Sequence, residues 1–459
     1  MIRSIMTLGK KNSLCFDLGV KQIAERTETY MSRSKAVYDL VASADSPSID
    51  SVIKPLHKLG FEAYVGNTEL EFLQHVSGDV ALREASCEAD KKISDFEVGQ
   101  SMRTDVFKQL QKVKALNISE LDSETNRWLD KAIRDGMRNG LHLSEDVRDK
   151  IEKIKKEMAS LAIDFNKNIA DENTVLEFSA SELEGVQHDL LDSLDRSNDN
   201  KLKVTLKYPH YVPIMRKCVN QDTRKTLEFA YNSRCKDVNL SVLHRLLELR
   251  KEFASILGYA SHSDSVLETR MAKSSVKVLA FLDDLKNKVK ESGRAEKEMS
   301  LMKRLRKKEA GISESEPLPA WDVSYYRNMM MEREYAVDNV EIQKYFPFDQ
   351  VTAEMLSIYE ELLSIRFNID DSQPRWHEDV KCYRVTADDK LIGFFYMDMF
   401  PRDGKYSHAA LFPLQPNCEY ETDRTVGVCS LVCNFTKPTA DKPACLTHDE
   451  VTTYFHEVS

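Results

Sequence analysis

The sequence has little glycine and proline, and it has no apolar run long enough to cross a membrane. It contains 15 Gly and 13 Pro among 459 residues. This composition favours helices over sandwiches or barrels, which need many tight turns. No apolar run approaches the ~20 residues that span a bilayer, so we expect no membrane partner. The chain also lacks a basic excess, because its net charge is −10. That balance argues against a nucleic-acid partner.

The cysteines form no paired framework. There are nine, an odd number scattered along the chain, which is typical of a reducing compartment and predicts a cytoplasmic protein. Residues 1–13 carry basic residues and no acid, but they lack the apolar core of a secretory signal. A mitochondrial address therefore stays open for this stretch. Cys429 and Cys433 are four residues apart and could share a helix face, although two buried apolar thiols are the simpler interpretation.

Hydrophobic periodicity predicts a mainly helical chain with a small sheet near its end. The clearest helix begins at Ser144 and has a helical spacing of apolar residues over about seven turns. The other predicted helices cover residues 83–116, 123–137, 239–257, 274–310, 321–337 and 350–365. In 274–310 we expect a buried seam formed by Val278, Phe281, Leu282, Leu285 and Val289. Alternation predicts a strand at 202–206 and a small antiparallel meander over 380–385, 391–400 and 408–412.

The last residues of the sequence have the pattern of a capped amphipathic helix. Thr447 and Glu450 have the Thr-x-x-Glu spacing of a capping box, and Leu446 stands where it would form a hydrophobic staple with Val451. An apolar face follows at spacings i, i+3, i+4 and i+7. Its members are Val451, Tyr454, Phe455 and Val458. We therefore predict a helix that begins near residue 448.

A His-Glu pair on this helix, His456-Glu457, is a candidate metal ligand beside a candidate general base. A zincin helix has the pattern His-Glu-x-x-His, which places two His one turn apart on one face. The second His would be residue 460, and the sequence ends at Ser459. The pair His377-Glu378 also lacks the second His, and we expect His377 to make a local hydrogen bond. A dipeptide alone is a weak signal in a chain with 11 His.

Longer motifs strengthen the interpretation of the terminal pair. They lie at residues 72–77, 88–92, 138–143, 163–168, 201–211, 376–380, 396–406, 434–441 and 448–457. Through these stretches the chain resembles the thimet oligopeptidase and neurolysin family of zinc metallopeptidases. The resemblance extends over nearly the whole chain from about Leu14. So many long motifs in the same order do not arise by chance.

The resemblance implies both a fold and an activity. The fold would be mainly α, a two-lobed helical metallopeptidase body with a deep channel and a small antiparallel β-sheet near the cleft. The activity would be that of a zinc metalloendopeptidase, an oligopeptidase that hydrolyses short peptides by a metal-activated water. By this resemblance His456 matches the first ligand of one Zn²⁺, and Glu457 matches the general base. The complete form is expected to be a monomer.

The sequence departs from the family pattern directly after this pair. The family continues Phe-Gly-His, whereas this chain has Val458-Ser459. The second zinc His and the downstream Glu ligand would lie beyond residue 459. Because catalytic zinc takes three protein ligands, we expect a truncated chain that has an incomplete catalytic lobe, does not hold zinc and is inactive alone. The alternative is a non-catalytic isoform that binds peptides or partner proteins.

These patterns divide the chain into four predicted parts. Its length suits two or three ordinary domains or one large helical body. An N-terminal extension covers residues 1–13, and an N-terminal helical region covers 14–170. A helical region of the channel wall covers 171–340. The start of the catalytic region, with the meander and the truncated zinc helix, covers 341–459.

Overall fold

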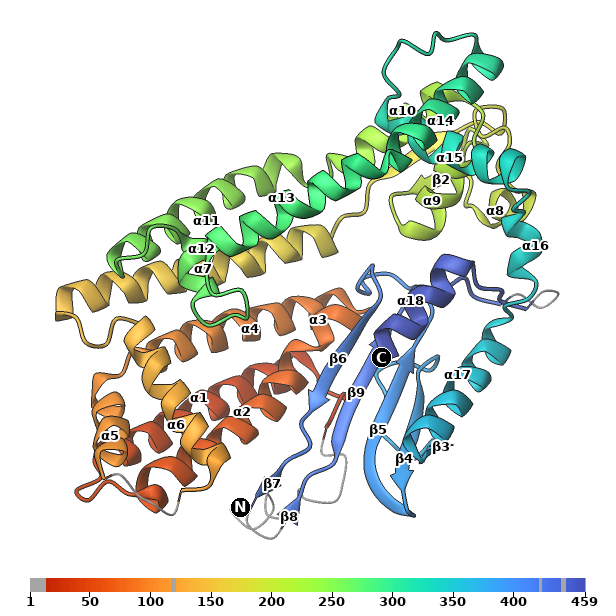
Figure 1. The fold of residues 1–459 in the computed structure, drawn as a ribbon. Coiled ribbons are helices and arrows are strands. Elements are labelled where there is room, and N and C mark those ends of the chain that lie inside the picture. Colours follow the sequence, from red (N-terminus) through yellow and green to blue (C-terminus); the bar gives the residue numbers. More distant parts are fainter. Residues whose placement is uncertain (1–13, 117–120, 421–422, 439–442, 459) are drawn as a thin grey trace.

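Helices predominate in the computed structural model, which describes residues 14–116, 121–420, 423–438 and 443–458 (Figure 1). Three predicted features lie outside the described residues: the extension 1–13, residues 439–441 of one family-like motif, and Ser459. Within the described part, no helix is both long and apolar enough to span a bilayer. The predominance of helices confirms the predicted mainly helical fold.

The first part of the chain forms helices that pack against one another. They are α1 (Val20–Ala42), the π-helical turn Ile49–Ile53, α2 (Lys54–Glu71), α3 (Leu73–Val76), α4 (Val80–Ser101), α5 (Thr104–Ala115), α6 (Ser123–Arg138) and α7 (Glu145–Ala170). Helix α7 confirms the long helix predicted from Ser144. The single helix predicted over 83–116 is two helices, because Arg103 adopts an extended conformation between α4 and α5.

The middle of the chain adds a hairpin and a second group of helices. These elements are β1 (Val175–Phe178), α8 (His188–Ser193), β2 (Leu202–Thr205), α9 (Tyr208–Lys217), α10 (Gln221–Asn232), α11 (Lys236–Ile256), α12 (His262–Leu267), α13 (Ser275–Ser292), α14 (Arg294–Ala310), α15 (Ala320–Glu334) and α16 (Asn339–Gln343). Strand β2 confirms the predicted strand and pairs antiparallel with β1. The helix predicted over 274–310 is broken at Gly293, whose φ of 61° is left-handed backbone that glycine adopts readily.

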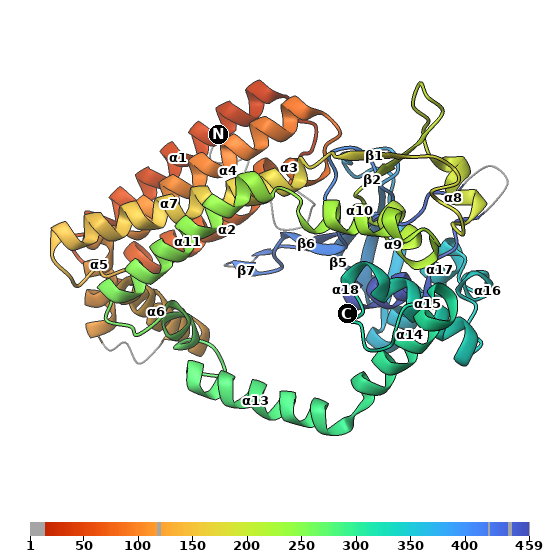
Figure 2. The same ribbon diagram turned by 90° about the horizontal axis from the view of Figure 1, so that it is seen from above.

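The buried seam predicted for α13 is wrong. Phe281 is 65% exposed, and Leu282, Leu285 and Val289 are each exposed to about half, while Val278 is intermediate. Within the described residues, α13 packs chiefly against α12 and α14 next to its two ends. Figure 2 shows it crossing between them with no other helix alongside. The periodicity correctly predicted that α13 has an apolar face. It could not predict whether another element of the fold packs against that face.

The last part of the chain forms a five-stranded sheet with helices on both faces. Its strands, in spatial order, are β3 (Ile365–Ile369), β4 (Lys381–Ala387), β5 (Lys390–Asp398), β9 (Gly427–Val432) and β6 (Ala410–Gln415). A short hairpin, β7 (Glu419–Tyr420) and β8 (Asp423–Arg424), precedes β9. The small sheet is confirmed, and all its pairs are antiparallel except β5–β9. The meander order fails after β5, because β9 lies between β5 and β6.

The composition of the strands explains this order. Strand β9 is apolar nearly throughout, as a strand paired on both sides and covered on both faces requires. Strand β6 contains Pro413, which has no N–H to donate to a neighbouring strand and so suits an edge. Strand β6 is accordingly an edge strand whose only strand partner among the described residues is β9.

Successive residues of the central strands point to opposite faces of the sheet. Phe395, Met397 and Leu431 face a cluster that includes α17 (Phe348–Leu363) and α18 (His448–Val458). The intervening residues face a second cluster, built from the N-terminal segment with α2 and α3. It includes Phe16, Phe72, Val76, Phe394, Tyr396 and Val428. The sheet therefore joins the first and last parts of the chain, as Figure 1 also shows.

A cluster of buried charged side chains lies at the C-terminal end of β5. The Asp398 side chain is 0% exposed and accepts two hydrogen bonds from Arg402, at 2.8 and 2.6 Å, and one from Trp376 Nε1 at 2.7 Å. The Lys405 side chain, also 0% exposed, donates to the Asp398 carboxylate at 2.8 Å. Lys405 donates further to the carbonyl oxygens of Asp398, Phe400 and Cys433 at 2.6–2.9 Å.

The same cluster reaches the N-terminal helices. Arg402 donates to the carbonyl oxygen of Val76 at the end of α3, at 3.0 and 2.6 Å. The turn between Arg402 and Lys405 contains Gly404, with a φ of 73°, where a Cβ would overlap the guanidinium of Arg83. Glycine is therefore required at this position for both conformation and space.

The charges in this cluster favour ionised Asp398. Burial alone would raise the pKa of the carboxyl, but the hydrogen bonds from Arg402 and the charges of Lys405 and Arg402 outweigh it, and the pKa lies below its usual value. Because folding lowers this pKa, the ionised Asp398 carboxylate stabilises the folded chain. Its contribution to the free energy of unfolding is fully present above the unfolded pKa of about 4. It is lost as the pH falls through the folded pKa.

Asp398→Asn tests this cluster. It leaves two cations without their carboxylate, one of them fully buried, so we expect the free energy of unfolding to fall by roughly 3–5 kcal/mol at neutral pH. The acid-induced loss of stability below about pH 4 should also become shallower. Urea denaturation at several pH values measures both effects. The control Glu157→Gln breaks an exposed pair with Arg245 and should change the urea midpoint little. Equal effects of the two substitutions would contradict the assignment.

A second pair of substitutions compares the sheet core with the exposed seam. Leu431→Ala removes a side chain that is 0% exposed, and we expect it to lower the free energy of unfolding by roughly 2–5 kcal/mol. Phe281→Ala on α13 should cost less than about 0.5 kcal/mol, because the ring is largely in solvent. Urea denaturation of each variant gives the comparison. A loss for Phe281→Ala as large as for Leu431→Ala would show that the α13 face is covered in solution.

Candidate active site

The predicted cap of the terminal helix is present. The Thr447 N–H donates to the Glu450 carboxylate at 2.7 Å, and the Glu450 N–H donates to the Thr447 hydroxyl at 3.1 Å. Leu446 and Val451 belong to one apolar cluster, as the predicted staple requires. Helix α18 therefore begins at His448, next to the cap that the sequence indicates.

The predicted apolar face fixes α18 to α17 and to the sheet. Tyr454 is 0% exposed, and Val451, Phe455 and Val458 pack against the same cluster. The hydroxyls of Tyr454 and Thr352 of α17 share a hydrogen bond of 3.0 Å. On the outer side of the helix, Arg216 of α9 forms an ion pair with Asp449 at 2.6 Å. These contacts hold α18 between the sheet and the helices of the middle region.

The candidate site residues follow one another at the end of α18. Consecutive residues of a helix point about 100° apart. His456 is exposed, whereas Glu457 is half-buried. The Glu457 carboxylate accepts a hydrogen bond of 3.1 Å from the backbone N–H of Leu411 in β6. Since β9 occupies the other side of β6, the candidate general base lies at the outer edge of the sheet.

The described residues do not by themselves fit a zinc site. Catalytic zinc is bound by three protein ligands. At the end of α18 the chain offers the exposed imidazole of His456, and no group of three His, Cys, Asp or Glu among the described residues is arranged to hold a metal ion. The structure therefore places the predicted ligand on an accessible surface, and the part of the chain that it describes assembles no complete ligand set around it.

The cysteines near α18 are not candidates for catalysis. Burial raises the pKa of Cys433 to about 12, and the nearby charges of Glu457 and Asp398 add to this while Lys405 opposes it. Burial also raises the pKa of Cys429 to about 11. Both thiols therefore stay protonated and unreactive. Cys429 lies in β9 and Cys433 directly follows that strand. The shared helix face considered for them is wrong. The simpler interpretation as a buried thiol holds for Cys433, whereas Cys429 is partly exposed.

The other His-Glu pair has the local role expected for it. The Asp379 N–H donates to His377 Nδ1 at 3.1 Å. The contact between Glu457 and Leu411, in contrast, was not predicted, because it joins residues 46 apart in the chain. A sequence signal for it existed in Pro413, which marks β6 as an edge strand.

Comparisons with known proteins place this arrangement in a family. The sequence model of Peptidase family M3 matches residues 214–458. Saccharolysin from Saccharomyces cerevisiae is 35% identical over 95% of this chain and 64% of its own length. Thimet-like oligopeptidase from Dictyostelium discoideum is 33% identical, over 95% of this chain and 67% of its own. Oligopeptidase A from Escherichia coli is 27% identical, over 84% and 58%.

The chain thus spans about two thirds of the length of the curated relatives it matches. The matched region of the family model includes the sheet, α17 and α18 with its His456-Glu457 pair. The family model and the two relatives above 30% identity agree with the resemblance in the motifs. The chain therefore belongs to Peptidase family M3.

Proposed function

We propose that this chain carries the peptide-binding strand and the first half of the catalytic motif of a zinc oligopeptidase that hydrolyses short peptides. The observation that carries the proposal is the Glu457 carboxylate at the outer edge of β6, directly after His456 on the same helix. Relatives named oligopeptidase support the substrate class. In this proposal His456 is the first zinc ligand, and the other ligands come from outside the described residues.

The edge of β6 suits an extended peptide backbone. An edge strand presents N–H and C=O groups that a further strand can pair with, and its affinity comes from main-chain hydrogen bonds. On β6 the Pro413 carbonyl already accepts a hydrogen bond of 3.0 Å from the Tyr64 hydroxyl, so the pairing would centre on Leu411. The Leu411 N–H points outward, since it donates to Glu457 and not to β9. A peptide carbonyl that accepts this hydrogen bond would displace the Glu457 carboxylate. The carboxylate would then lie beside the bound backbone, where a general base can take a proton from an attacking water.

A second candidate function is peptide binding without cleavage. It rests on the same outer edge of β6 and on the single candidate ligand that the described residues provide at α18. The two functions share the binding step and differ only in turnover, so separate experiments distinguish them.

The binding step predicts a sensitivity to backbone methylation. We expect an extended eight-residue peptide to lose about tenfold in affinity when the alternate amides on one of its edges are N-methylated, since each lost hydrogen bond weakens binding. Methylation of the amides on the other edge should have little effect. Fluorescence anisotropy with labelled peptides measures both. Equal affinities for the two methylated peptides would refute strand addition.

Substitutions at Leu411 locate the binding to β6. Leu411→Pro removes the outward N–H and should weaken binding of the unmethylated peptide, whereas Leu411→Ala keeps the donor and should bind almost normally. Circular dichroism confirms that both variants fold. Equal binding by the proline and alanine variants would place the peptide elsewhere.

The incomplete ligand set predicts the behaviour of the 459-residue chain with zinc. Because His456 is one ligand where three are needed, we expect weak zinc binding by titration calorimetry and turnover of a quenched short peptide close to the buffer rate. The control His456→Ala should remove even the weak binding.

The opposite result is equally informative. Stoichiometric tight zinc, with turnover that a chelator and Glu457→Gln both abolish, would refute the incomplete site and confirm the peptidase assignment for this chain. Turnover that survives both treatments would contradict the assignment of His456 and Glu457.

A further inference from the structure

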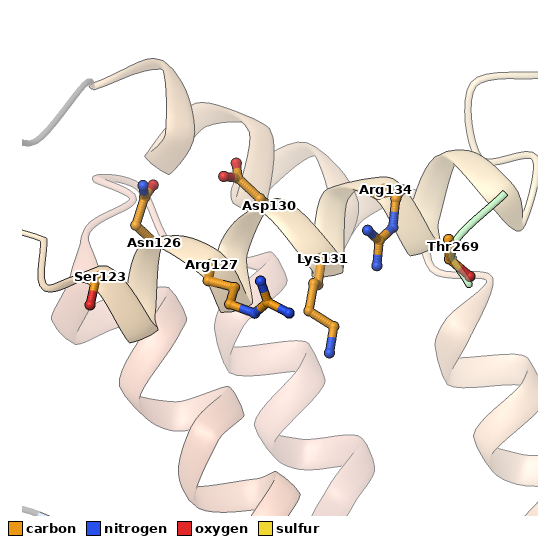
Figure 3. A pocket seen from close by; sticks show the side chains of 7 residues that line it. All are labelled: Ser123, Asn126, Arg127, Asp130, Lys131, Arg134 and Thr269. Atoms are coloured by element: carbon orange, nitrogen blue, oxygen red, sulfur yellow. The ribbon is translucent and has the colours of Figure 1, made fainter. Parts of the chain in front are cut away.

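Helix α6 carries a row of basic side chains that neither the candidate active site nor the hydrophobic core uses. Arg127, Lys131 and Arg134 follow at i, i+4 and i+7, and all three are exposed. Together with other residues of α6 they line a hollow of about 480 Å³ that Thr269, after α12, closes on one side. Figure 3 shows the three basic side chains pointing to the same side of α6.

Among the described residues, two of these cations have no salt-bridge partner and the third has only weak ones. Asp130, the one acid among the described residues that line the hollow, forms an ion pair with Lys114 of α5 at 2.7 Å, and Figure 3 shows its carboxylate on the side away from the basic groups. Within the described residues, no salt bridge includes Arg127 or Lys131, while Arg134 has a 3.7 Å contact with its neighbour Asp135 and an electrostatic interaction with Glu268. Like charges at i and i+4 repel one another on a helix, so this arrangement favours an anionic partner.

We propose that this surface, the α6 basic row of Arg127, Lys131 and Arg134 with the hollow they line, binds an acidic segment of a peptide. The proposal rests on the proposed function, because the bound peptide would be the substrate of the same chain. It adds a preference for substrates that carry carboxylates away from the bond that is cleaved.

The spacing of the row specifies the acidic pattern. Four residues of a helix rise about 6 Å, the axial distance between Arg127 and Lys131. In an extended peptide, side chains two residues apart lie on one side and about 6.8 Å from each other. Carboxylates at alternate positions, as in Glu-x-Glu, therefore match the spacing of Arg127 and Lys131. Adjacent glutamates point to opposite sides of an extended backbone and do not match.

The position of α6 separates this contact from the candidate active site. Figure 2 shows α6 and α18 on different sides of the ring that the described helices form. A peptide that reaches both would place its acidic segment at a distance from Glu457. The row therefore selects and orients peptides and does not take part in the chemistry.

A peptide fits these observations better than a nucleic acid. Proteins that bind duplex DNA tightly neutralise about 6–10 phosphates, whereas this hollow presents three cations over two turns of one helix. The net charge of −10 on the whole chain also repels a long polyanion. A short acidic segment contacts only the row and avoids that repulsion.

Binding of labelled ten-residue peptides to the 459-residue chain tests the proposal. A peptide with glutamate at three alternate positions should bind at least fivefold more tightly than the matched glutamine peptide at low salt. A peptide with the same three glutamates placed consecutively should bind less tightly than the alternating one. The preference should shrink at 200 mM salt, because exposed charges are screened.

Substitutions then assign the preference to α6. Lys131→Gln should reduce the glutamate preference about threefold, and Arg127→Gln with Lys131→Gln should remove most of it. The control Lys390→Gln, at an exposed lysine that begins β5, makes the same charge change elsewhere and should leave the preference intact. All three variants alter solvent-exposed side chains, and their circular dichroism should match that of the parent chain.

The outcomes separate this inference from the proposed function, because binding is measured without hydrolysis. Equal affinity for the glutamate and glutamine peptides, or a preference that Lys131→Gln does not change, overturns the inference and leaves the proposed function standing. A single-stranded oligonucleotide that binds more tightly than the acidic peptide overturns the peptide assignment. A glutamate preference that depends on Lys131, in a chain that shows no binding at β6, supports the inference and counts against the proposed function.

Discussion

The buried carboxylate of Asp398 joins the segments on which the candidate site depends. It lies at the end of β5 and binds Arg402 and Lys405 of the following turn. Lys405 in turn binds the carbonyl of Cys433 after β9, and Arg402 binds the end of α3. Helix α18 packs on the sheet face that these strands form. The Asp398 cluster therefore helps to position Glu457 at β6, although the cluster contacts neither Glu457 nor β6.

A second buried cluster has the same role among the helices. Asp322 of α15, with its side chain 1% exposed, pairs with Arg224 of α10 at 2.6 Å and with Arg306 of α14 at 3.2 Å. The Arg224 guanidinium also lies over the ring of Tyr325 at 4.1 Å. Burying such charges is costly unless every partner is in place. Each cluster therefore favours one arrangement of its elements and penalises others, where apolar contacts alone would tolerate small shifts.

The sequence predicted those features that depend on neighbouring residues. The cap of α18, its apolar face around Tyr454 and the length of α7 all follow from spacings within one helix. The insertion of β9 between β5 and β6 did not follow, because pairing between distant strands is decided by burial on both faces. For the same reason the apolar row around Phe281 predicted a buried face wrongly. Periodicity shows that a helix has an apolar side, and only the whole fold shows whether anything covers it.

The contact between Glu457 and Leu411 has consequences for both the free and the bound chain. An unpaired edge strand can add a strand from another molecule and so promote aggregation. The Glu457 carboxylate occupies the Leu411 N–H of this edge, and a charge at that position discourages pairing with a second sheet. A peptide that binds to β6 must compete for the same N–H, since one donor serves one acceptor at full strength. Under the proposed function, peptide binding at β6 and release of the Glu457 carboxylate from Leu411 would therefore occur together.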